Sequence, residues 1–161
     1  MPNYCNNHLY MTADKDTIDK LEAAYKDGTL LETLRPQPTY EGYAPSGQPC
    51  NNQGMPDWWN WRVANWGTKW DVGGENTHIE RTSDTEIYMS FDSAWSPPVA
   101  ALQSRDDISY RLYYCEFGMA FCGIAQGEDG FHDDDTYEIG QEPQELTERF
   151  NIAEMMEEDE E

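Results

Sequence analysis

The chain of 161 residues carries a formal net charge of −22, which excludes ordinary binding of nucleic-acid phosphates because such binding needs a basic face. The charge also disfavours anionic membranes, so basic proteins and cations are the partners that it favours. The length suits one domain, and six Trp, ten Tyr and five Phe supply a folded core despite the charge.

The sequence shows neither a membrane span nor a signal peptide. Its longest apolar stretches are far too short to cross a bilayer, and its first residues have no basic start and no apolar run. The four cysteines are dispersed without a CxxC pair, which favours reduced, buried thiols over a disulfide framework. We therefore expect a cytoplasmic protein without a membrane partner.

The first two predicted elements are a strand and a helix. Residues 3–11 alternate with a period of two, which is typical of a strand. A helix is predicted over residues 13–27, where Gly28 is placed to end it. The apolar stripe of this helix has the expected spacing and consists of Ile18, Leu21, Ala24 and Tyr25.

Residues 29–74 form a predicted insertion that is rich in proline, glycine and tryptophan, with a short helix over residues 57–67. Successive helical residues are about 100° apart, so the tryptophans cannot all face the domain. We expect Trp59 or Trp66 to be partly exposed, which would suit a binding platform. The simpler role is burial, with at least two of these four acting as anchors: Trp58, Trp61, Trp66 and Trp70.

Strand patterns recur after the insertion, at residues 77–82, 85–91, 109–117, 119–126 and 131–139. A short helix is predicted over residues 97–103, where a serine and two prolines open it. A terminal helix is predicted from Pro143, with an apolar stripe of Leu146, Phe150 and Ala153.

The order of these elements predicts an α+β fold with a ferredoxin-like antiparallel sheet, because it follows the split βαβ pattern. Both helices, 13–27 and 97–103, should pack on one face of that sheet. We divide the chain into a ferredoxin-like domain over 1–140, interrupted by the Trp-rich insertion 29–74, and an acidic C-terminal helix and tail over 141–161.

Three segments carry a resemblance to a known family. They are Met1-Pro2-Asn3-Tyr4-Cys5-Asn6-Asn7, Asn65-Trp66-Gly67-Thr68-Lys69-Trp70-Asp71 and Phe91-Asp92-Ser93-Ala94-Trp95-Ser96-Pro97-Pro98. In order and spacing they resemble the YubB-type ferredoxin-like domain family of plasmids and phages. The resemblance covers roughly residues 1–127 and implies a ferredoxin-like topology without an iron–sulfur cluster, and a mobile-element origin. It implies no catalytic residue.

Several motifs suggest chemistry, but each has a simpler explanation. The acids around His132 have the oxygen ligands of a hard-cation site, yet they lack the spacing of a calcium loop. Cys5 and His8 should point to opposite faces of a strand, which opposes a zinc site. Residues 65–69 lack the glycine-rich start of a phosphate loop, and no histidine lies beside a Ser or Cys motif. We therefore expect no enzyme, metal or cofactor.

An aromatic sheet that stacks RNA bases is a further alternative, because RNA-recognition domains share the ferredoxin-like topology. The candidate aromatics are Tyr88, Tyr110, Tyr113, Tyr114 and Phe117. The sequence pattern of those domains is absent and the charge opposes phosphate binding, so no direct nucleic-acid partner is expected.

Residues 128–161 hold fifteen acidic side chains and a single basic one, Arg149. Our hypothesis is a non-enzymatic phage or plasmid protein that binds and modulates a host protein with a basic surface, such as a nucleic-acid-handling enzyme. The acids would mimic nucleic-acid charge at a basic groove. The predicted contact residues are Asp133, Asp134, Asp135, Glu138, Glu142, Glu145, Glu148, Trp59 and Trp66.

Two alternatives stay open at this point. The acidic run is also typical of a solubilising tail, which would have no partner. A protein of another class would bind or convert a small molecule in a pocket between the Trp-rich insertion and the sheet.

Overall fold

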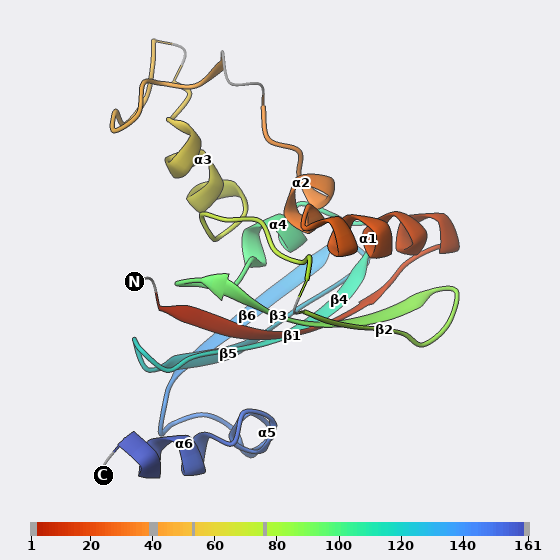
Figure 1. Cartoon of the computed structure of the whole chain (residues 1–161), viewed down its shortest axis with the longest axis vertical. Helices are drawn as coiled ribbons and strands as arrows, with labels where there is room; N and C mark the ends of the chain where they lie inside the picture. Colours follow the sequence, from red (N-terminus) through yellow and green to blue (C-terminus); the bar gives the residue numbers. More distant parts are fainter. Residues whose placement is uncertain (1–2, 39–41, 53, 76, 160–161) are drawn as a thin grey trace.

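The computed structural model describes residues 3–38, 42–52, 54–75 and 77–159, with side chains through residue 156. One antiparallel sheet runs in the order β2-β3-β1-β4-β5-β6 and separates two layers of helices (Figure 1). The strands are β1 (Tyr4–Thr12), β2 (His78–Arg81), β3 (Glu86–Ala94), β4 (Ser109–Glu116), β5 (Phe121–Glu128) and β6 (Phe131–Glu138). The helices are α1 (Lys15–Asp27), α2 (Leu30–Leu34), α3 (Trp58–Asn65), α4 (Val99–Gln103), α5 (Gln144–Arg149) and α6 (Ile152–Asp159).

The first four strands and the helices α1 and α4 follow the ferredoxin-like pattern. Strand β1 lies in the middle and pairs antiparallel with β3 and β4, while β2 pairs with β3 at the edge. This arrangement confirms the predicted fold class. Strands β5 and β6 then extend the sheet beyond β4, so that β6 forms the second edge.

The main core lies between the sheet and α1. Side chains alternate along β1 and β3, so that Leu9 and Met89 point to the helices and are fully buried. The predicted stripe of α1 meets them, and the Tyr25 hydroxyl donates to the carbonyls of His78 and Ser90. Val99 and Leu102 of α4 belong to the same core cluster, which confirms that α1 and α4 pack on one face.

Helix α1 begins and ends where local chemistry places its boundaries. The Asp14 carboxylate accepts a hydrogen bond from the Thr17 N–H at 2.7 Å, and Gly28 ends the helix in the left-handed conformation with a φ of 78°. The insertion returns close to this end, where a Cβ at Gly73 would collide with the Tyr25 carbonyl. Glycine at position 73 therefore lets the end of the insertion lie against α1.

Two tryptophans anchor the insertion, as predicted. Trp61 is 7% exposed and Trp66 only 1% exposed, and their rings meet edge to face. The prediction that Trp66 is a contact residue is wrong, because Trp66 follows the last turn of α3 and its Nε1 donates to the Arg35 carbonyl at 2.9 Å. Trp59, in contrast, is 37% exposed.

The terminal helix also differs from its prediction. It is broken at Asn151, whose positive φ of 50° separates α5 from α6. The break changes the buried stripe to Leu146, Phe150 and Ile152, while Ala153 is exposed. Both helices lie on the face of the sheet opposite α1–α4 (Figure 1), where they form a second small core with β4 and β5.

Candidate functional site

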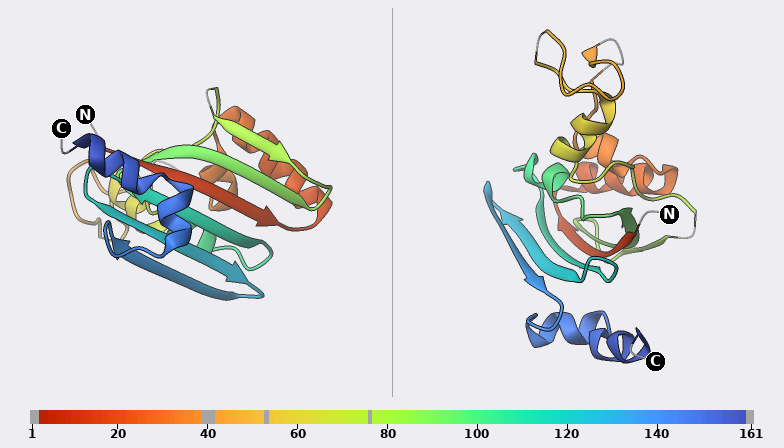
Figure 2. Two further views of the ribbon diagram at one scale, coloured as in Figure 1. Left: turned by 90° about the horizontal axis from the view of Figure 1, so that it is seen from below. Right: turned by 90° about the vertical axis from the view of Figure 1, so that its left-hand side faces the viewer.

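The face of the sheet that carries α5 and α6 is called the lower face, and these helices cover only part of it (Figure 2). Beneath them lie Tyr113, Cys115 and Cys122. The neighbouring cross-strand row is the centre of the uncovered part. We call this row the open strip, and the strand pairing defines it as Glu80, Tyr88, Tyr10, Arg111, Gln126 and Asp133.

Arg149 joins α5 to the tyrosines of the lower face. Its guanidinium carbon lies 3.9 Å from the ring centre of Tyr113 and 5.4 Å from that of Tyr10. It also donates to the Tyr10 hydroxyl at 3.1 Å. One turn earlier, Glu145 accepts from the Tyr113 hydroxyl at 2.6 Å and lies 3.6 Å from Arg111. Aromatic and charged contacts therefore hold α5 at the border of the open strip.

His8 forms the other docking contact of this helix pair, because the Phe150 ring stacks on it at 4.6 Å. Burial lowers the pKa of His8, and the positive charge of Arg149 lowers it further. As the pH falls, the unfolded chain therefore binds this proton before the folded chain does. The stability that neutral His8 contributes is present at neutral pH and is lost as the pH falls through the ordinary histidine range.

We expect the free energy of unfolding to fall more steeply between pH 7.5 and pH 5.5 in the native chain than in a His8→Gln variant. Urea unfolding at about five pH values in this range would measure the two slopes. The other ionisable groups are the same in both proteins and cancel in the comparison. Equal slopes would contradict the lowered pKa of His8.

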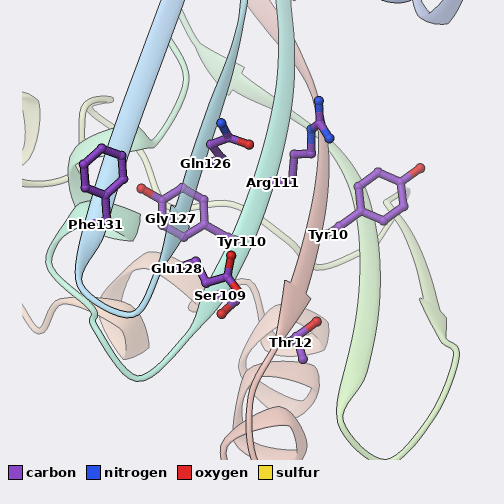
Figure 3. Close-up of a pocket in the computed structure, with 9 residues that line it drawn as sticks. All are labelled: Tyr10, Thr12, Ser109, Tyr110, Arg111, Gln126, Gly127, Glu128 and Phe131. Carbon is purple, nitrogen blue, oxygen red and sulfur yellow. The ribbon is translucent and has the colours of Figure 1, made fainter.

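Two hollows flank Tyr10 on the open part of the lower face. The first, about 390 Å³, is shown in Figure 3 and lies between β1, β4, β5 and the start of β6, where Phe131 is 75% exposed. The second, about 420 Å³, lies over β1, β2 and β3 and is lined by Tyr88 and two glutamates. Tyr10 and Thr12 line both hollows, so the two are neighbours on one surface.

A third hollow, about 610 Å³, lies between the end of the insertion and the sheet. A pocket is predicted at this place if the protein binds or converts a small molecule. Its lining is polar, contains no tryptophan and includes His8, His78 and Asp92. Burial raises the pKa of Asp92. In the described part of the chain no hydrogen bond joins Asp92 to either histidine, so no oriented acid–base pair is formed there.

The predicted acidic contact residues lie on β6 and around α5, and the sheet divides them. Asp133 and Asp135 face the lower side together with Gln126 and Ile124, their partners on β5. Asp134 points to the other side, where it accepts from the Tyr114 hydroxyl at 2.7 Å. The three consecutive aspartates therefore do not form one surface, because the pleat of a strand sends neighbours to opposite faces.

The pKa of Asp134 is raised for two reasons. Burial is the larger cause, and the negative charges of Asp135 and Asp133 raise the pKa further. Tyr114, the hydrogen-bond partner, has a raised pKa that is also caused mainly by burial. The strand edge thus keeps like charges close together.

The acids around α5 have different surroundings. Glu142 accepts from the Gly140 N–H at 2.7 Å, and Glu148 accepts from the Gln144 side chain at 3.2 Å. Glu145 is held by Tyr113, which stands in the same cross-strand row as Asp135. Glu138 is exposed on the other side of β6. We define the acidic ridge as Asp133 and Asp135 of β6 with Glu142, Glu145 and Glu148 around α5.

The structure does not bring the predicted tryptophans to this ridge. Trp59 lies on α3, above the sheet in Figure 1, whereas α5 lies below it. Trp66 is buried and can contact no partner. The predicted contact residues therefore do not share one surface, because the ridge lies on the lower side, Asp134 and Glu138 on the other side of β6, and Trp59 on α3.

The cysteines and histidines that the sequence offers for metal binding or nucleophilic chemistry lie apart from one another or are buried. Cys5 belongs to the core beneath α1 whereas His8 faces the lower side, as the strand period predicted. Burial raises the pKa of Cys115 to about 12 and that of Cys122 to about 11, so both thiols stay protonated. Across the described ranges, no three His, Cys, Asp or Glu side chains are grouped to hold a metal, and no helix could cross a membrane.

Tyr10 and Arg149 were not predicted from the sequence as parts of one site. Of the aromatics proposed for base stacking, Tyr110 and Tyr114 are buried against the helices of the upper layer. Tyr113 lies under Arg149. The alternation along β1 was the available signal, because it places Tyr10 on the same face as His8.

Comparison with known proteins shows a family and a fold. Residues 74–158 match the family model described as "Ferredoxin-like domain in Api92-like protein". This range includes β6, α5 and most of α6, which the resemblance noted in the sequence leaves unexplained. No curated protein matches the sequence.

The solved structure of protein api92 from Yersinia pseudotuberculosis is similar, with a TM-score of 0.58 and 11% sequence identity. The similarity covers 89% of this chain and 100% of that one. At this identity the likeness shows the fold alone.

Proposed function

This chain belongs to the family of the ferredoxin-like domain in Api92-like protein, and we propose from its own surface that it is a non-enzymatic protein that binds and modulates a protein with a basic groove. The partner would be a nucleic-acid-handling enzyme of a host cell, and the acidic ridge would occupy the groove in place of nucleic acid. We also propose that the chain is related to the YubB-type family and comes from a plasmid or phage. It would act in the cytoplasm of the host cell.

The observation that carries the proposal is the lack of cations beside the β6 aspartates. Two arginines elsewhere are paired with acids: Arg81 bridges Asp19 and Glu22, and Arg105 lies 2.7 Å from Asp107. In the described part of the chain Asp133 and Asp135 have no such partner. Like charges that stand together without compensation weaken the free protein, and a cationic partner relieves that repulsion.

The spacing of the ridge supports a partial likeness to nucleic acid. Same-face carboxylates on a strand are about 6.6–6.8 Å apart, whereas duplex DNA carries one charge per about 1.7 Å of axis. β6 alone is therefore sparser than a DNA strand, and the glutamates around α5 are needed to add a second row. Asp133 and Asp135 are held on a regular strand and Glu145 on a docked helix, so the charges are fixed in place.

The test compares two double variants with the same change in charge. Asp133→Asn with Asp135→Asn alters the ridge, and Asp16→Asn with Asp27→Asn alters exposed residues of α1 on the opposite layer. The ridge variant should lose partners captured from a host lysate at low salt, while the α1 variant keeps them. Capture of partners by the native protein should weaken steeply as the salt concentration rises, because exposed charges are screened within about 8 Å at physiological ionic strength.

The ridge variant should also unfold at a higher urea concentration, with a gain of about 0.2–1 kcal/mol from relieved repulsion. This measurement shows that lost capture is not lost folding. If the ridge variant returns the same partners with unchanged salt dependence, the ridge is not the contact. If deletion of residues 157–161 alone abolishes capture, these last five residues are the contact and the ridge does not act as a likeness to DNA.

A further inference from the structure

The second hollow on the open part of the lower face combines aromatic rings with carboxylates. The rings of Tyr10 and Tyr88 lie 4.7 Å apart at an interplanar angle of 37°. Glu80 and Glu86 also line this hollow of about 420 Å³, and no lysine or arginine does. A cation is attracted by the faces of aromatic rings and by the carboxylates, whereas an anion is repelled by the carboxylates.

The same tyrosine surface already holds one guanidinium of the chain itself. Arg149 lies over Tyr113 and Tyr10, next to Glu145, which hydrogen-bonds to Tyr113. Tyr10 therefore lies between two groups of side chains, and each group consists of tyrosines and glutamate. On one side Arg149 contacts the tyrosines. On the other side Tyr88, Glu80 and Glu86 line the open hollow.

The carboxylates of the hollow have only weak partners within the chain. Glu80 lies 3.2 Å from His78, an exposed histidine, and Glu86 accepts from the Thr82 hydroxyl at 3.4 Å. In the part of the chain that the structure describes, neither glutamate is paired with a lysine or an arginine. Both are thus available to a cationic ligand.

We propose that this hollow binds an arginine side chain of a partner peptide, with the guanidinium at the rings of Tyr10 and Tyr88 and hydrogen-bonded to Glu80 and Glu86. Arginine suits the site better than lysine because its planar group stacks on rings and binds carboxylates with two N–H groups. Tyr10 and Thr12 also line the first hollow, so an extended peptide can continue across the strands toward Phe131.

This site is independent of the acidic ridge. Glu80 and Glu86 belong to β2 and β3, and the ridge aspartates belong to β6 at the opposite edge of the sheet. The first test uses three acetylated, amidated peptides of glycine and serine that carry one central arginine, lysine or citrulline. Citrulline has the shape of arginine without its charge. Nuclear magnetic resonance would follow the ring signals of Tyr10 and Tyr88 during each titration.

The arginine peptide should shift both ring signals and bind about fivefold more tightly than the citrulline peptide. Glu80→Gln with Glu86→Gln should remove this preference. Asp133→Asn with Asp135→Asn, which changes the charge equally, should leave it unchanged. Tyr88→Leu should weaken binding and Tyr88→Phe should restore it, which separates a stacking ring from a purely structural one.

Equal binding of arginine and citrulline, or unchanged binding in the Glu80 and Glu86 variant, would overturn the proposal. Shifts confined to β6 and α5 would also overturn it, and would leave the proposed function of the ridge intact. Conversely, loss of lysate capture in the ridge variant has no bearing on this hollow, so the two proposals fail separately.

Discussion

Replacing Trp66 by alanine should lower the free energy of unfolding by about 3–5 kcal/mol, the range for large buried aromatic side chains. The Trp66 ring is 1% exposed, it meets Trp61 edge to face with ring centres 6.0 Å apart, and Arg62 lies 4.8 Å over it. The substitution also leaves the Arg35 carbonyl without the indole N–H that it accepts at 2.9 Å. Urea unfolding followed by circular dichroism would measure the loss.

The matched control is Trp59→Ala on α3, the helix that Trp66 follows. Trp59 is 37% exposed, so its removal should cost far less than that of Trp66. A loss below about 1 kcal/mol for Trp66 would place this ring at the surface and would revive the idea that the insertion is a binding platform. A large loss for both would contradict the exposed position of Trp59 on α3.

Periodicity predicted the fold well where one face of an element is buried and the other is wet. Two patterns allow only one orientation toward the core, and both are confirmed. They are the apolar stripe of α1 and the alternation on β3 that places Ile87, Met89 and Phe91 on one face. The order of these elements then selects the ferredoxin-like topology, because the split βαβ pattern places β1 between β3 and β4. Local pattern and chain order therefore sufficed for the sheet and for the layer of α1 and α4.

Periodicity could not place the terminal helices. The lower face of β4 and β5 carries Tyr113, Cys115 and Cys122, which need a cover, but nothing in a helical stripe states which face of the sheet it will cover. The break at Asn151 changed the stripe itself, because a left-handed residue rotates the following helix about the preceding one. The contact of Arg149 with Tyr10 depends on which face α5 covers and was therefore not predictable.

The acidic candidates show the same limit at a smaller scale. The run of three aspartates is visible in the sequence, but its effect depends on the strand that contains it. Once β6 is placed, the pleat assigns Asp134 to Tyr114 and leaves only Asp133 and Asp135 on the lower face. Trp66 gives a parallel case, because a helix wheel does not locate a residue that follows the last turn.

Replacing Leu146 by alanine should detach α5 and α6 from the sheet while the rest of the domain stays folded. Leu146 is fully buried against Tyr113 and the two cysteines of the lower face, and such truncations cost about 2–5 kcal/mol. The contacts of α5 and α6 lie outside the main core beneath α1. The loss should therefore appear as local opening and not as global unfolding.

Thiol titration under native conditions measures this opening directly. In the native chain only Cys50 is exposed, so one thiol should react quickly with a disulfide reagent. In Leu146→Ala three should react, because Cys115 and Cys122 lose their cover and their pKa falls from the values that burial imposes. Cys5 should stay protected, because it lies in the main core on the other side of the sheet.

The control is Leu21→Ala on α1, which weakens the main core and leaves the second core in place. It should lower the global stability without selectively exposing Cys115 and Cys122. If Cys5, Cys115 and Cys122 react at one common rate in Leu146→Ala, then α5 and α6 open only together with the whole domain. In that case the division of the chain at residue 140 fails, and α5 and α6 are an inseparable part of the ferredoxin-like domain and not an addition to it.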